Sequence, residues 1–169
     1  MNMNQVKKNL WPFVWGLWSV LMVAAVILLF FLDNPAGLPG IRYLGWAVLV
    51  ISAIFGWLPI FEFRGKGAVP DGESYIKTTV LVDSGIYAVV RHPQYLAGML
   101  LSLALILVSQ HWIMVVIGVV AMGLNYAIAV RADQDLIEKF GDDYQRYMQQ
   151  VPRMNFLLGL VRWLRRRES

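Results

Sequence analysis

The sequence predicts an all-α, polytopic membrane protein with about four transmembrane helices and a C-terminal cytoplasmic helical segment. Hydrophobic residues make up 58% of the 169 residues and charged residues only 15%, whereas a typical soluble domain has about 25% charged residues. The mean hydropathy is +0.55. The apolar residues also gather in long runs, as expected for helices that need about 20 apolar residues to cross a bilayer.

The first pair of predicted spans covers residues 12–32 and 41–61. Residues 33–40 between them have the sequence Asp-Asn-Pro-Ala-Gly-Leu-Pro-Gly, which is typical of a short connection. The first run is too long for the apolar part of a signal peptide, and no small-residue cleavage site follows it. We therefore expect it to be retained as a membrane helix.

The second pair of predicted spans covers residues 93–109 and 112–130. Pro93 suits the first turn of a helix, because the N–H that proline lacks has no intrahelical partner there. The remaining segments are a cytoplasmic loop at 62–92 and a cytoplasmic tail at 131–169. Together these segments are predicted to form a single membrane domain over residues 1–169.

The tail carries two amphipathic patterns. In the first, apolar residues recur at spacings of three and four on one helical face, and Gly141 is expected to interrupt the helix. The simplest interpretation is packing against the membrane domain. These residues are Leu136, Phe140, Tyr144, Tyr147 or Met148, and Val151. In the second, residues 156–167 place apolar side chains opposite several arginines, which indicates an interfacial helix on anionic lipid.

The distribution of basic residues predicts the orientation of the chain. All but one of the 15 lysines and arginines fall at the N-terminus, in the 62–92 loop or in the tail, and the exception is Arg42. The positive-inside rule then places both termini and the central loop in the cytoplasm. This bias also accounts for the net charge of +4, so we expect contact with membrane lipid and none with nucleic acid.

The polar residues that open the third predicted span are candidates for a functional site. Arg91, His92 and Tyr95 lie at the start of an apolar run, where charge is costly. Tyr95 lies three residues after His92 and can share its helix face, while Gly98 would let a ligand or a neighbouring helix approach closely. The alternative is structural, with Arg91 reaching lipid phosphate and His92 capping the helix.

A second candidate group follows the fourth predicted span at the same membrane boundary. An acid such as Asp133 or Asp135 can bind an ammonium group, while Arg91 can bind a carboxylate. An amino-acid-like ligand carries both of these groups. The alternative is an ordinary solvated helix end containing Arg131 and the two aspartates.

Several kinds of chemistry are not expected from this chain. It has no cysteine and only two histidines, His92 and His111, which are too few ligands for a predicted metal site. There is no phosphate-binding P-loop and no glycine-rich dinucleotide motif.

Two motifs of the chain, and their order, resemble those of the superfamily of isoprenylcysteine carboxyl methyltransferases and phospholipid methyltransferases. The first is Gly85-Ile86-Tyr87-Ala88-Val89-Val90-Arg91-His92-Pro93-Gln94-Tyr95-Leu96-Ala97-Gly98. The second begins at Asp135-Leu136, continues through Phe140-Gly141-Asp142-Asp143-Tyr144 and Tyr147, and is followed by Val151-Pro152-Arg153. A hydrophobic hairpin of the right size separates them, and the resemblance covers roughly residues 60 to 155.

The resemblance implies an integral membrane enzyme that uses S-adenosylmethionine at a cytoplasmic pocket. It implies a catalytic role for Arg91 and His92. It also implies that these two residues contact the cofactor, together with five others. The other implied contacts are Tyr87, Pro93, Tyr95, Gly98 and Asp133. The paired glutamates of the family fall on Ala132 and Asp133, so one acid is missing here and the other is shortened.

The substrate implied by the resemblance is lipophilic, either a prenylcysteine carboxylate or a phospholipid amine, and a small thiol is also compatible. Two other interpretations stay open. The chain is a non-catalytic membrane scaffold that kept the fold, which the alanine at position 132 favours, or it is a reductase related to the sterol reductases that share this fold. Binding of S-adenosylmethionine would distinguish the methyltransferase from both.

Overall fold

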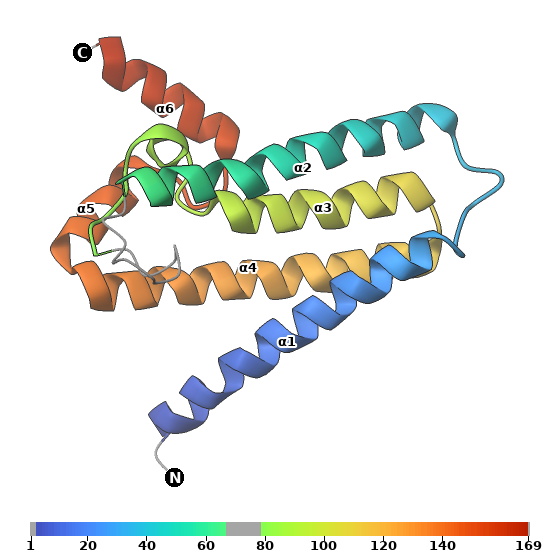
Figure 1. Ribbon diagram of the computed structural model, residues 1–169, viewed down its shortest axis with the longest axis horizontal. Helices are drawn as coiled ribbons and strands as arrows, with labels where there is room; N and C mark the ends of the chain where they lie inside the picture. Colours follow the sequence, from blue (N-terminus) through green and yellow to red (C-terminus); the bar gives the residue numbers. More distant parts are fainter. Residues whose placement is uncertain (1–2, 67–78, 169) are drawn as a thin grey trace. The chain divides into compact units, whose positions relative to one another are not determined.

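The computed structural model describes residues 3–66 and 79–168 (Figure 1). Within these ranges the chain forms helices and no strand, which confirms the all-α class. The elements are α1 (Met3–Leu29), α2 (Pro39–Lys66), the short 3-10 helix η1 (Gly85–Ala88), α3 (Pro93–Ser109), α4 (Trp112–Phe140), α5 (Asp142–Gln150) and α6 (Phe156–Glu168).

Among the described residues, three helical segments are long and apolar enough to cross a membrane, judged by length and composition. They are Leu10–Leu29, Pro39–Glu62 and Trp112–Phe140. Helix α3 is also apolar, but with 17 residues it is shorter. The expected four spans and their orientation therefore stay predictions.

Several helix ends differ from the predicted spans. Helix α1 ends at Leu29, before the predicted residue 32, while α2 continues past residue 61 and α4 continues past residue 130. The charged residues after position 130 end the apolar run, yet they are compatible with helical backbone, so α4 continues through them to Phe140. The break comes at Gly141, as expected, where φ is 56°. Much of the predicted loop at 62–92 lies outside the described residues.

The chain divides into two compact units. The first comprises Met1–Ser52 and Gly98–Val130, and the second comprises Ala53–Ala97 and Arg131–Ser169. In the first unit, α1 packs on α3 and α4 through a core of Met22, Ala25, Leu105, Met114 and Ala121.

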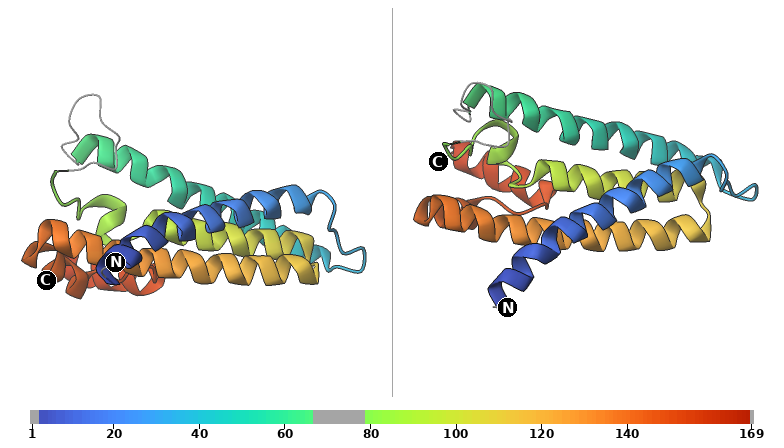
Figure 2. Two further views of the ribbon diagram at one scale, coloured as in Figure 1. Left: turned by 90° about the horizontal axis from the view of Figure 1, so that it is seen from below. Right: turned by 60° about the horizontal axis from the view of Figure 1, so that its bottom comes forward.

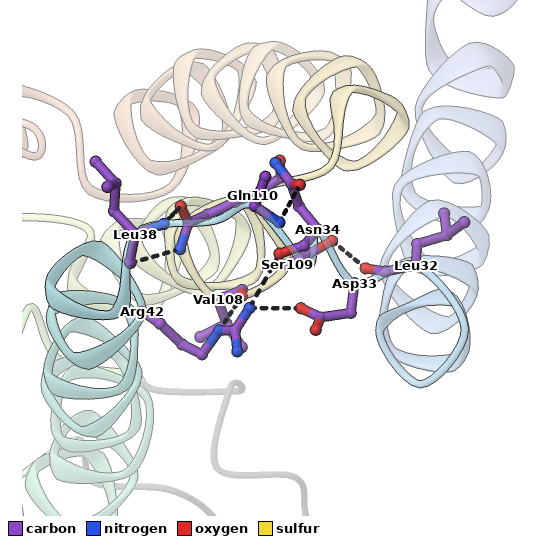
Figure 3. Close-up of polar contacts among 9 residues, drawn as sticks. Leu32, Asp33, Asn34, Leu38, Arg42, Val108, Ser109 and Gln110 are labelled. Carbon is purple, nitrogen blue, oxygen red and sulfur yellow. Dashed lines mark hydrogen bonds and ion pairs between the residues drawn. The ribbon is translucent and has the colours of Figure 1, made fainter.

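The first unit is closed at one end by the connections α1–α2 and α3–α4, which meet in both views of Figure 2. Figure 3 shows their polar contacts. The Gln110 side chain accepts from the Leu38 N–H at 2.8 Å and donates to the Leu38 carbonyl at 3.0 Å. Arg42 donates to Asp33 at 2.7 Å and to the Val108 carbonyl at 3.3 Å. These bonds satisfy backbone groups that the turns leave unpaired.

The second unit is built around the predicted stripe of the tail. Tyr144, Tyr147 and Val151 are buried together, and Leu136, Phe140 and Met148 pack against them. The predicted stripe is thus confirmed as a packed face. Because Gly141 turns the chain between α4 and α5, both helices contribute to the same cluster.

Candidate active site

The candidate site lies in the second unit, where the segment before α3 meets the segment after α5. The backbone N–H groups of Arg91 and His92 donate to the carbonyls of Pro152 and Arg153, at 3.1 and 3.0 Å. The two segments therefore run side by side, held by main-chain bonds. This pairing carries the Arg153 side chain to the same place as Arg91 and His92.

The carboxylate of Asp133 is the centre of the site. Its Oδ1 atom lies 2.7 Å from His92 Nε2 and accepts a hydrogen bond from the Tyr144 hydroxyl at 2.6 Å. Its Oδ2 atom accepts from Arg153 Nε at 2.6 Å and from Arg91 Nη2 at 3.3 Å. Asp133 is 2% exposed, so these four side chains replace the water that the carboxylate has lost.

The protonation states of the partners follow from their burial. Burial lowers the pKa of His92 below its ordinary value, although the hydrogen bond to Asp133 opposes this shift. The neutral ring therefore donates its Nε2 proton to Asp133 and keeps a lone pair on Nδ1. Burial, followed by the hydrogen bond to Asp133, raises the pKa of Tyr144, so its hydroxyl stays protonated and donates.

Arg91 has donors that the cluster does not use. Its side chain is buried, and its Nε and Nη1 atoms have no hydrogen-bond partner among the described residues. Buried donors in proteins nearly always have a hydrogen-bond partner, so two donors without one on the same side chain need an explanation. Two guanidinium groups also share the single Asp133 carboxylate, which leaves the cluster with excess positive charge. An anionic ligand group fits both observations.

Aromatic rings border the cluster. The Tyr95 and His92 rings lie 5.2 Å apart between centroids, and the Arg91 guanidinium carbon lies 5.9 Å from the centroid of the Tyr144 ring. The Tyr147 hydroxyl donates to the carbonyl of Tyr87 at 2.6 Å, which ties α5 to η1. These contacts restrict the orientation of the charged side chains.

A cavity of about 750 Å³ lies in the same unit. Its size falls in the range of ligand pockets, about 300–1,000 Å³. Tyr147 and Trp163 contribute aromatic surface to it, while Arg166 and Asp83 contribute charge. This mixed lining suits a ligand with both polar and apolar parts, but it includes neither Asp133 nor any of the four side chains that bind the Asp133 carboxylate.

The structure brings together Arg91, His92 and Asp133, which the sequence marked separately in two groups. Pro93 follows His92 in the chain as the first residue of α3. Gly98 belongs to the first unit, where a Cβ atom would lie 2.7 Å from Asn125 Nδ2 and 3.1 Å from Trp18. The close approach at Gly98 is therefore made by neighbouring side chains. Asp135 is more than half exposed and pairs with Arg131 at 2.6 Å, apart from the cluster.

Two members of the cluster were not predicted as site residues. Tyr144 was assigned to the packed apolar stripe. That interpretation did not account for its hydroxyl group, which donates to Asp133. Arg153 stood at the end of the second motif without a role. A buried tyrosine generally needs a partner for its hydroxyl, so the Tyr144 position within an apolar stripe was the available signal.

Among residues 3–66 and 79–168, no group of three or more histidines or acids is arranged to hold a metal ion. The donors at the site are guanidinium, imidazole and phenol groups around one carboxylate. Such a set is suited to an organic anion.

The described fold and site define a class of helical membrane proteins with a buried ionic site. The chain belongs to the phospholipid methyltransferase family, whose model matches residues 41–142, more than half of the sequence. This membership supports a membrane methyltransferase type of function. The matched range contains Arg91, His92 and Asp133, whereas Tyr144 and Arg153 lie beyond it. No curated protein matches the chain.

Proposed function

We propose that the chain transfers a methyl group from S-adenosylmethionine to a lipophilic substrate. One observation carries this proposal: Arg91 is buried in an excess of positive charge with two donor atoms unpaired among the described residues. The methionine part of the cofactor ends in a carboxylate, which is the natural partner of a guanidinium group. Family membership supplies the reaction type.

Arg91 is proposed to hold the cofactor carboxylate through its Nε and Nη1 donors. Tyr95 and Tyr87 are proposed to offer aromatic surface near the positively charged sulfonium, since cations are attracted to aromatic faces. Pro93 would set the start of α3 directly after His92, and Gly98 would set the packing of α3 within the first unit. In the cofactor, the sulfonium would supply the methyl group.

Asp133 has two candidate roles. The sequence favoured contact with the cofactor's ammonium group, whereas the contacts favour a positioning role, because both oxygens already accept from side chains of the protein. We propose that Asp133 holds Arg91 and His92 in place. A charge on Asp133 would still attract a nearby ammonium group without direct contact.

The protein must align the nucleophile with the methyl group and exclude water, because a displacement of this kind depends mainly on positioning. A carboxylate nucleophile needs no base. An amine nucleophile must lose a proton, and the lone pair on Nδ1 of neutral His92 is the proposed acceptor. Both a prenylcysteine carboxylate and a phospholipid amine are therefore compatible with this site.

Binding of the cofactor provides the test. The purified protein in detergent should release or absorb heat with S-adenosylmethionine or S-adenosylhomocysteine, and Arg91→Lys should weaken binding, because lysine keeps the charge but not the fork of donors. Incubation with cofactor carrying a labelled methyl group and with each lipid class would then identify the substrate. If the protein binds neither ligand, the methyltransferase proposal is wrong.

A second candidate is a non-catalytic scaffold that retains the family fold. The observation that favours it is the complete set of hydrogen bonds around Asp133, which is what a purely structural cluster needs, together with alanine at position 132. A scaffold would show no heat with either cofactor form.

A further inference from the structure

Helix α6 has one side that contacts the protein and one that does not pack against it. At Gly159 an added Cβ would lie 1.8 Å from the Val89 carbonyl oxygen, so the helix backbone touches the segment before α3. Phe156 meets Phe55 edge to face, with ring centroids 5.1 Å apart. Arg166 donates to the Ala88 carbonyl at 2.7 Å. These contacts hold α6 against residues 88–89.

The opposite side of α6 is apolar and exposed. Its four large apolar side chains remain 41–75% exposed, and they are Leu157, Leu158, Val161 and Leu164. Positions 157, 161 and 164 follow the spacing of one helical face. A face of this kind on a short helix indicates an interaction surface.

Exposed arginines accompany this apolar face. Arg162, Arg165 and Arg167 are all exposed, and the only acidic residue of α6 is Glu168 at its end. Arginine side chains beside leucine and valine are the composition of helices that lie in the interface of a bilayer. Basic residues near such a surface are attracted to anionic lipid headgroups.

We propose that α6 docks on the surface of an anionic bilayer through its exposed face. The leucines and Val161 would enter the headgroup region, and Arg162 and Arg165 would contact lipid phosphates. A second copy of the chain fits less well, because two equally basic faces repel one another. This inference does not rest on the proposed function, since lipid contact and methyl transfer are measured separately.

Docking would act on the same segment that presents the site. The residues held by α6, Ala88 and Val89, lie immediately before Val90 and Arg91. Lipid that restrains α6 would therefore also restrain the backbone leading to Arg91. The fold thus links a lipid-binding surface to the candidate site through a few residues.

The absence of cysteine in the chain permits a direct test with single fluorescent labels. We would label Leu164→Cys in full-length protein reconstituted in vesicles that contain brominated phosphatidylcholine as a quencher. Quenching should be strong when phosphatidylglycerol is present and weak in purely zwitterionic vesicles, and high salt should reduce it. A label at Gln149→Cys, an exposed position of α5, should respond little in either vesicle.

The charge requirement is tested by Arg162→Gln/Arg165→Gln in the labelled protein. Each arginine near an anionic surface changes the docked fraction several-fold, so the pair should lower the docked-to-free ratio by roughly thirty-fold. The matched control, Lys7→Gln/Lys8→Gln, removes the same charge from the other end of the chain and should leave the label unchanged. Equal quenching in both vesicle types would overturn the proposal, as would weak lipid quenching with label self-quenching that grows with protein density, which would indicate a second copy.

Discussion

Two of the arginine–aspartate pairs among the described residues lie in different units of the fold, and their surroundings differ sharply. In the first unit, Arg42 and Asp33 are 37% and 61% exposed and pair at 2.7 Å next to the turn connections (Figure 3). In the second unit, Arg91 and Asp133 are 6% and 3% exposed and pair at 3.3 Å. The Arg42–Asp33 contact is therefore both the shorter and the more solvent-exposed of the two.

This difference in exposure agrees with a structural role for the first pair and supports the proposed functional role of the second. An exposed pair is screened by water and contributes about 0–1 kcal/mol, so Arg42 serves mainly to bond turn carbonyls. A buried pair costs desolvation energy that its attraction rarely exceeds. Stability alone is therefore a weak reason for such a cluster, and the unpaired donors of Arg91 support the proposed ligand-binding role.

The largest expected effect is on stability at Asp133. Asp133→Asn should destabilise the protein by about 3–5 kcal/mol, because the buried guanidinium group of Arg91 and the partly buried one of Arg153 would lose their counter-charge. The measurement is thermal or denaturant unfolding in detergent. Asp135→Asn is the matched control, since that carboxylate is exposed. An equal loss of stability in this variant would show that burial of the Asp133 cluster is not the cause of the effect.

The next effect separates binding from stability at Arg91. Arg91→Lys should reduce affinity for S-adenosylhomocysteine about ten- to a hundred-fold, because a charge-assisted hydrogen bond is worth roughly 1.5–3 kcal/mol. Calorimetric titration would measure this change. Arg42→Lys should leave the affinity as it is. Comparable losses in both variants would mean that the Arg91 donors do not contact the ligand.

The third effect concerns pH and His92. Because burial lowers the pKa of His92 in the folded protein, the unfolded chain binds its proton first as the pH falls. Stability should therefore decrease as pH drops below the ordinary histidine value of about 6.5, by at most about 1.4 kcal/mol per pH unit. Unfolding measured across this range should show a shallower slope in His92→Gln. A flat profile in the unaltered protein would contradict the prediction.

The smallest effect is expected at the exposed pair. Asp33→Asn should cost about 0–1 kcal/mol, because asparagine can still accept from Arg42 and water screens the charge. The same unfolding assay applies, with high salt as the check. If salt lowers the stability of the unaltered protein by much more than this amount, the Arg42–Asp33 pair contributes more to stability than expected.

Much of the site was visible in the sequence because its parts are local signals. Arg91 and His92 precede an apolar helix, where charge stands out, and Asp133 follows another. The geometry adds what spacing along one helix cannot supply. His92 and Asp133 lie 41 residues apart, and Arg153 reaches Asp133 only because its segment pairs with residues 91–92.

The sequence by itself determined the helices, their apolar character and the break at Gly141, since these depend on local hydrophobicity and backbone freedom. It also indicated the polar residues that open α3. Only the tertiary structure decided that Tyr144 and Arg153 join Asp133, that Asn125 and Trp18 crowd Gly98, and that Arg91 keeps unpaired donors. The physical reason is that burial and hydrogen bonding between distant segments depend on how packed helices bring them together, which no local pattern specifies.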